Sequence, residues 1–198
     1  LSLCLLEVVT LLVICSGFQK PLKLVSLMIA KIALNVREFM NVSNQGRKLL
    51  MLWEGVKEKI YLDSAGLPTI GCGHLLTKDE LRSGKIKIGN EFVKYENGLT
   101  NLQIDQLLHQ DLHIAEETVT NNVCVVLTQY QFDALCSFVF NVGSKAFVNS
   151  TLLKVLNSGD FDAVRNQLRR WNKSGGRIVS GLINRREKEI SLFNSGFA

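Results

Sequence analysis

The chain has 198 residues, of which 46% are hydrophobic, and it carries a formal net charge of +5 with a pI near 9.0. This length is enough for one well-buried domain and leaves little room for a second independent one. The positive charge fits an anionic partner, whether a cell envelope, a nucleic acid or an acidic membrane. The basic residues near the end of the chain lack the interleaved aromatics of single-strand binders, so we expect no nucleic-acid partner.

The cysteines predict neither disulfides nor a metal site. The chain contains five of them, namely Cys4, Cys15, Cys72, Cys124 and Cys136. They form no close pair and their number is odd, which favours free, buried thiols. Cys124 and Cys136 lie among apolar neighbours, where cysteine behaves as a small hydrophobic residue. Cys72 and His74 would supply only two ligands, so we expect no metal and no cofactor.

Residues 1–39 differ in composition from the rest of the chain. Residues 1–18 are apolar apart from Glu7, Pro21 follows, and residues 24–36 are apolar around Lys31. A membrane-spanning helix needs about 20 apolar residues, and a secretory signal needs a basic start and a small-residue cleavage site. The segment is marginal for both. It is either a membrane anchor or upstream sequence without consequence, with the main domain beginning at Met40.

A helix followed by a small sheet is predicted from Ser43 to His74. The apolar run before Glu54-Gly55 indicates a helix that ends at Glu54, because glycine commonly stops a helix. Between Lys59 and His74, short β-type pieces alternate with glycine-rich turns and predict a small antiparallel sheet. Glu54 is therefore expected where a helix meets the turn-rich segment that carries Asp63.

The remaining pattern is mostly helical. Capping boxes at residues 77–80, 100–103 and 128–131 open three helices, the third of which is hydrophobic enough to be the central core helix and ends at Gly143. Residues 86–93 predict a hairpin or an irregular insertion. Further helical runs cover about 151–156, 161–171 and 181–193. We therefore expect an α+β fold, mostly helical, in which a small antiparallel sheet lobe and a larger helical lobe enclose a cleft.

Two carboxyl groups in different surroundings can take different roles. Glu54 follows apolar residues, and desolvation would help it to keep its proton, whereas hydrogen-bond donors in the turn would keep Asp63 ionised. An acid paired with an anion is what glycoside hydrolysis requires. Each residue also has an ordinary interpretation: Glu54 as an ion-pair partner at a helix end, Asp63 as a turn cap and Thr69 as a strand residue.

The run WEGVKEKIYLDSAGLPTIGCGH, residues 53–74, carries Glu54, Asp63 and Thr69 followed by two glycines. Their order and spacing resemble those of the phage endolysin lysozymes of the T-even and lambdoid kind. The resemblance continues at residues 74–78, 140–143, 147–150, 170–171 and 185–187, and so covers residues 40–198. It implies a muramidase that cuts the β-1,4 bond between N-acetylmuramic acid and N-acetylglucosamine in bacterial peptidoglycan.

The resemblance also implies roles for individual residues. Glu54 would be the general acid, Asp63 would supply negative charge, and Thr69 would orient the attacking water, with inversion at the sugar. Contacts with the glycan are implied for five residues: Gly73, Leu75, Phe140, Asn141 and Asn149. Phe140 is expected mainly to pack, and a helix N-cap would explain Asn149 and Ser150 equally well.

Three other features are expected to be structural. We interpret His74 as a satisfied hydrogen-bonding residue and Trp171 as part of the core. The basic group at residues 185–187 is interpreted as a surface network that draws the protein toward the anionic wall.

The resemblance also gives expectations for the cell. Residues 40–198 would be the catalytic domain, and residues 1–39 either a signal-arrest-release anchor in transient contact with the inner membrane or non-native upstream sequence. The protein would be a monomer in a phage-infected host, held in the cytoplasm or on the inner membrane, and would act on periplasmic peptidoglycan. Two rivals remain: a lytic transglycosylase, against which Asp63 argues, and a non-catalytic cationic protein that binds the wall or perturbs membranes.

Overall fold

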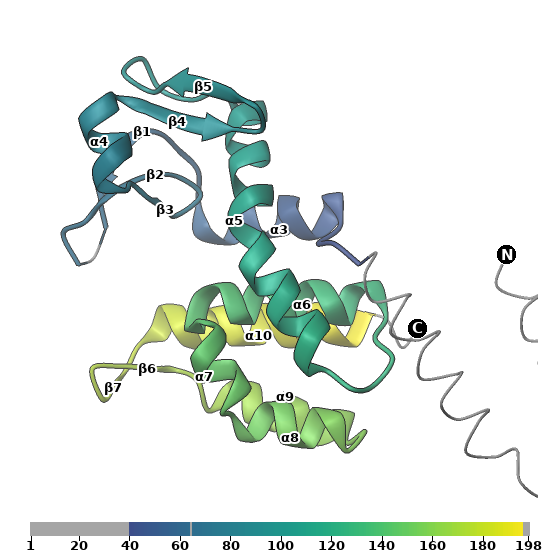
Figure 1. Ribbon diagram of the computed structural model, residues 1–198. Coiled ribbons are helices and arrows are strands. Elements are labelled where there is room, and N and C mark those ends of the chain that lie inside the picture. Colours follow the sequence, from purple (N-terminus) through teal and green to yellow (C-terminus); the bar gives the residue numbers. More distant parts are fainter. Residues whose placement is uncertain (1–39, 64, 196–198) are drawn as a thin grey trace, which may run out of the picture. The chain divides into compact units, whose positions relative to one another are not determined.

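A long helix, α5 (Asn101–Asn122), connects a small mixed lobe to a helical lobe (Figure 1). The structure is a computed structural model that describes residues 40–63 and 65–195. The expected α+β fold, with a small sheet lobe and a larger helical lobe, is confirmed. The proposals for residues 1–39 fall outside the described residues. Within the described part, no helix is long and apolar enough to cross a membrane.

The small lobe follows the first described helix, α3 (Asn44–Glu54). Its three-stranded antiparallel sheet has the order β1 (Lys57–Leu62), β2 (Pro68–Gly71), β3 (His74–Leu75). Thr69 lies in the central strand, opposite Tyr61 on one side and Leu75 on the other. A short helix α4 (Lys78–Ser83) and the hairpin of β4 (Lys85–Ile88) and β5 (Glu91–Lys94) complete the lobe. This hairpin is the first of the two alternatives predicted for residues 86–93.

The helical lobe is built around α6 (Gln129–Val142), whose residues 131–139 are all buried. The last helix, α10 (Ser180–Asn194), runs along α6, as Figure 1 shows in yellow and green. The other elements of the lobe are α7 (Ser144–Val148), α8 (Thr151–Asn157), α9 (Phe161–Arg169), β6 (Lys173–Ser174) and β7 (Arg177–Ile178). Because other elements also cover α6, the residues of α10 that face it are buried away from solvent.

The predicted capping boxes and the predicted end of α3 are confirmed, whereas the helix expected over about 161–171 ends at Arg169. Thr77, Thr100 and Thr128 each form a complete capping box, and the Ser43 side chain accepts a hydrogen bond from Gly46 N at the start of α3. Gly55, with φ of 76°, ends α3 and donates its N–H to Met51 O. Two short elements were not predicted, helix α7 and the β6–β7 hairpin, because segments this short carry almost no periodic signal.

The expected burial of the cysteines is correct for two of the three that the structure describes. Cys72 and Cys136 are buried and free, whereas Cys124 is free and exposed. Cys124 follows the end of α5, and its backbone N–H donates to Asn157 Oδ1 at 2.7 Å. Apolar neighbours along the chain therefore misled the prediction, since at this surface turn the thiol faces away from the core.

Candidate active site

Helix α3 is fixed at its start, and this sets the position of Glu54 at its end. Ser43 N donates to Asp133 Oδ1 at 3.0 Å, and the preceding Val42 N donates to Glu116 Oε1 at 2.7 Å. Both acceptors are buried on the helices α5 and α6. The start of α3 is thus attached to the core of the protein, and the Glu54 carboxyl group lies at the opposite end of the helix.

Glu54 lines a pocket of about 450 Å³ between α3, α6 and the beginning of α10. The residues around it are Trp53, Glu54, Asn141, Val179, Gly181, Leu182, Asn184, Arg185 and Lys188. Glu54 and Asn141, which the sequence resemblance had assigned to separate roles, are therefore brought together here. Lys188 Nζ lies 6.0 Å from the centre of the Trp53 ring and adds a second cation to the pocket.

Arg185 forms an ion pair with Glu54. The Arg185 side chain is only 9% exposed, and the other donors of its guanidinium are also used, with Nε 3.0 Å from Glu189 Oε1 and Nη2 3.2 Å from Ser137 O. Arginine cannot be deprotonated easily, so it is a durable cation beside the carboxyl group. Glu54 is 30% exposed, which leaves part of the carboxyl group open to the pocket.

The expectation that residues 185–187 form a surface network is wrong for both arginines. Arg185 and Arg186 are 8% and 1% exposed, and Arg186 Nη2 donates to Asn141 Oδ1 at 2.8 Å. Only Glu187 fits the expectation, since it is exposed and pairs with Arg169 at 2.8 Å. The physical reason is the buried Glu189, whose negative charge allows two arginines to enter the interface between α6 and α10.

Burial shifts the pKa values of Arg185, Arg186 and Glu189. Burial lowers the pKa of Arg185, and it lowers the pKa of Arg186 to about 10, although Glu189 favours the charged form of both. Arg186 therefore remains a cation near neutral pH. Burial also raises the pKa of Glu189, against the effect of the two arginines.

Asp63 lies in the turn between β1 and β2 and is supported locally. Its Oδ1 accepts the backbone N–H groups of Ala65 and Leu67, both at 2.8 Å. Thr69 is buried, and its hydroxyl donates to Leu67 O at 3.0 Å. Leu67 thus links the two residues, because its N–H binds the Asp63 side chain and its carbonyl accepts from Thr69.

The other residues predicted to contact the glycan lie in varied settings. Gly73 occupies the turn after β2 with φ of 82°, and Leu75 on β3 is 48% exposed. Phe140 is half-buried and packs against the core, as expected. The Asn149 amide donates to Lys145 O at 2.8 Å at the end of α7, and Ser150 caps α8. The N-cap explanation is therefore confirmed for Ser150, while Asn149 is exposed at a helix end.

His74 is hydrogen-bonded at both ring nitrogens, as expected for a satisfied hydrogen-bonding residue. Its Nδ1 lies 2.9 Å from Asp111 Oδ2 and its Nε2 lies 3.3 Å from Glu80 Oε1. Burial works against the imidazolium, but the hydrogen bond and charge of Asp111, with those of Glu80, outweigh it and raise the pKa of His74. Burial raises the pKa of the neighbouring Cys72 thiol to about 12, so this sulfur is a poor nucleophile. Among the described residues, no group of three or more metal-ligating side chains could hold a metal ion.

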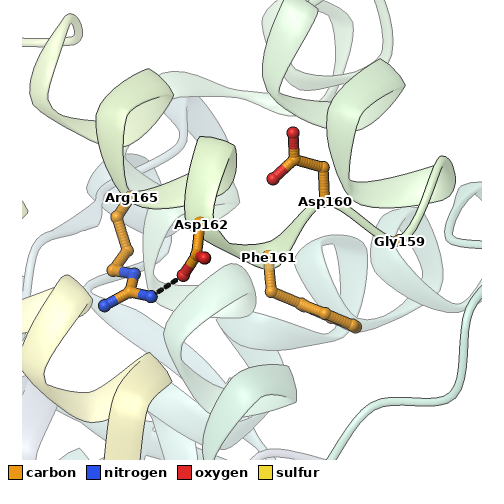
Figure 2. Close-up of a pocket in the computed structure, with 5 residues that line it drawn as sticks. All are labelled: Gly159, Asp160, Phe161, Asp162 and Arg165. Carbon is orange, nitrogen blue, oxygen red and sulfur yellow. Dashed lines mark hydrogen bonds and ion pairs between the residues drawn. The ribbon is translucent and has the colours of Figure 1, made fainter.

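A second pocket, of about 330 Å³, lies at the start of α9 (Figure 2). Asp160 caps the helix by accepting from Ala163 N at 2.9 Å, and Asp162 pairs with Arg165. The polar groups here are thus engaged within one turn of the helix. We assign no function to this pocket.

The residues that sequence reasoning missed are Arg185 and Glu189 of the Glu54 network. One signal was available, because an arginine and a glutamate four residues apart lie on one face of a helix. The sequence does not say that this face is turned toward α6.

The two lobes, the long connecting helix and the carboxyl group at a helix end define a lysozyme-like protein. The family model described as phage lysozyme matches residues 51–189, and the chain belongs to this family.

Individual relatives agree with the family. The chain is 38% identical to the endolysin of Salmonella phage P22 over 79% of this chain and 99% of the relative. It is 33% identical to the SAR-endolysin of Escherichia phage Mu over 90% of this chain and 94% of the relative. The solved structure of a P22 lysozyme mutant is 36% identical, with a TM-score of 0.64, over 78% of this chain and 99% of that one. The chain spans only 55% of the length of the endolysin of Bacillus phage B103, to which it is 36% identical.

Proposed function

We propose that this protein is an endolysin, a muramidase that hydrolyses the β-1,4 bond between N-acetylmuramic acid and N-acetylglucosamine in bacterial peptidoglycan, for host lysis and phage release. The observation that carries the proposal is Glu54, which lies at the end of α3 in an open pocket and shares it with Asn141. Membership of the phage lysozyme family supports it, and so do relatives named endolysins. We propose that the protein acts as a monomer on the host cell wall.

In the proposed reaction, Glu54 gives a proton to the glycosidic oxygen. Asp63 stabilises the oxocarbenium-like transition state by its charge, and it takes a proton from the water that attacks from the opposite face of the sugar, with inversion. The amide of Asn141 is proposed to bind an N-acetyl group of the glycan while Arg186 holds its oxygen. The remaining proposed glycan contacts are Gly73, Leu75, Phe140 and Asn149.

Thr69 is proposed to orient the attacking water. Its hydroxyl donates to Leu67 O, which leaves the oxygen lone pairs to accept a hydrogen bond from water. The same hydrogen bond connects Thr69 to Leu67 and so helps to hold the turn that carries Asp63. Thr69→Ser keeps both capacities and should retain most activity, whereas Thr69→Val should lose it.

We further propose that residues 1–39 tether the protein to the inner membrane before release, and that residues 40–198 form the catalytic domain. The match to the Mu SAR-endolysin is aligned over 179 residues, a span longer than residues 40–198 provide, so this similarity extends upstream of Met40. Fractionation of expressing cells tests the idea. Full-length chain in the membrane fraction supports the tether, and an intact mass that begins at Met40 contradicts it.

Mass spectrometry of muropeptides released from purified peptidoglycan tests the proposed activity. The full chain, Glu54→Gln and Glu187→Gln are compared, the last as a control at an exposed glutamate. Reducing muramic acid ends from wild type and Glu187→Gln, but not from Glu54→Gln, are expected. Anhydro ends would indicate a transglycosylase instead. Bacterial killing that survives Glu54→Gln would indicate a cationic wall-binding or membrane-perturbing protein.

A further inference from the structure

Glu189 is a buried acid behind the Glu54 pocket, to which the family resemblance gave no role. It is fully buried on α10, and its Oε1 accepts three hydrogen bonds, from Ser137 Oγ at 2.9 Å, Arg185 Nε at 3.0 Å and Arg186 Nη2 at 3.1 Å. Its Oε2 lies 2.9 Å from Arg186 Nε. A carboxylate this far from solvent requires such compensation.

These contacts leave Arg185 one free direction. Its Nε binds Glu189 and its Nη2 binds the Ser137 carbonyl, so its Nη1 points to Glu54. The guanidinium fork is planar and rigid, so fixing two nitrogens fixes the third. The position of Arg185 against Glu54 is therefore set by Glu189 from the side away from the pocket.

We propose that Glu189 is a positioning residue for catalysis, which holds Arg185 in place beside Glu54 and competes with Glu54 for its positive charge. The proposal rests on the proposed function insofar as it calls Glu54 a general acid. If Arg185 paired with Glu54 alone, its positive charge would favour the ionised form of Glu54, and a carboxylate cannot donate a proton. By sharing Arg185, Glu189 lets Glu54 keep its proton at higher pH.

The charges around the pocket agree with this balance. The charged groups that share it with Glu54 are Arg185 and Lys188, both on α10, while α3 and α6 contribute the uncharged Trp53 and Asn141. Arg186 binds Asn141 and lies over the face of the Phe138 ring, 4.8 Å from its centre. Glu189 is thus the anion that offsets the two buried arginines on the side away from Glu54.

The test is Glu189→Gln in the full chain, with Glu187→Gln as the matched control on the same helix. The new glutamine side chain would keep an acceptor for Arg185 but not the charge, so the cation would pair more fully with Glu54. We expect kcat on purified peptidoglycan to fall about 10- to 100-fold, as for a small misplacement of a catalytic group, with KM little changed. We also expect the alkaline limb of the pH–activity profile to move to lower pH. The control should match wild type in both.

Two further variants separate positioning from support of the fold. Glu189→Asp keeps the charge but shortens the side chain, so the alkaline limb should return toward that of wild type while kcat stays about tenfold low. In an Arg185→Gln background, Glu189→Gln should add little further loss, because its route to Glu54 is gone. Additive losses in this cycle would overturn the proposal.

A readout without substrate keeps the inference separate from the proposed function. The protonation of Glu54 is followed by carbon-13 NMR of its carboxyl carbon, and its midpoint should fall in Glu189→Gln. If wild type releases no muropeptides, the muramidase proposal fails, and the NMR midpoint alone decides on Glu189. A folded Glu189→Gln protein with wild-type kcat and midpoint overturns the inference. If that variant does not fold, wild-type kcat in Glu189→Asp overturns it.

Discussion

The two carboxyl groups proposed for catalysis stand on supports of different kinds. Asp63 is held by backbone N–H groups two and four residues further along the chain, within a single turn of the small lobe. Glu54 is held by Arg185, which comes from the last helix and is itself fixed by Glu189 and Ser137. Asp63 is therefore positioned by local chain geometry, whereas Glu54 is positioned by tertiary packing.

This difference has a consequence for mutation. A change in α6 or α10 can alter Glu54 without touching Asp63, because the buried network lies wholly in the helical lobe. A change in the turn between β1 and β2 should alter Asp63 alone. The following variants test that separation.

The largest loss is expected for Glu54→Gln. The amide cannot donate the acidic proton, so kcat should fall by about 10²- to 10⁴-fold, the usual contribution of a general acid. Release of reducing ends from peptidoglycan measures the loss, and far-UV circular dichroism should show an unchanged fold. Wild-type-like activity in the folded variant would overturn the assignment of Glu54.

Asp63→Asn should cause the next largest loss of kcat. The Asn oxygen can still accept from Ala65 and Leu67, so the turn is kept while the negative charge is lost. Loss of one preorganised electrostatic group commonly costs about 10²- to 10³-fold in kcat. Asp79→Asn, at an exposed acid of α4 in the same lobe, is the control and should leave the rate unchanged. Equal rates for the two variants would contradict the role of Asp63.

The same contrast explains how much of the site could be predicted from sequence. The turn at Asp63 and the end of α3 at Gly55 follow from local rules, and these structural predictions are confirmed. The capping boxes are local as well. The burial of Arg185 was not predictable, because basic residues in a polar helix normally face water. The burial of Arg185 is favourable only because α10 packs on α6 with the Glu189 carboxyl group buried in the interface.

Gly46→Ala tests the anchored end of the helix that carries Glu54. A Cβ at Gly46 would lie 2.6 Å from Asp133 Oδ2 and 2.9 Å from Val42 Cγ1. Asp133 cannot simply turn aside, because it accepts two hydrogen bonds from Ser43. We expect the free energy of unfolding to fall by about 1–3 kcal/mol, as for overpacking, despite the better helix propensity of alanine.

Urea unfolding measures the effect of Gly46→Ala, with Gln45→Ala at the neighbouring exposed position as the control. A shift of α3 should also lower kcat through Glu54, while the turn of Asp63 is unaffected. Gly46→Ala as stable as its control would show that the contact relaxes without cost.

The effect that depends on pH is expected for His74→Gln in the small lobe. The pKa of His74 is raised by Asp111 and Glu80 against the effect of burial, so the charged form stabilises the fold. This contribution is complete below the unfolded value of 6.5 and is lost as the pH rises through the higher folded value. The pKa of Glu80 is lowered by Thr77 and His74 against burial, so its contribution is lost as the pH falls below 4.5 and through its folded value.

His74→Gln should therefore cost most between pH 4.5 and 6.5. A hydrogen bond to a charged partner is worth about 1.5–3 kcal/mol, so urea unfolding at pH 5.5 should show about that loss, and a smaller one near pH 9. His113→Gln is the control, because that side chain is 67% exposed and its ion pairs are worth little. A cost of His74→Gln that is the same at both pH values would mean that the imidazole acts by packing and not by charge.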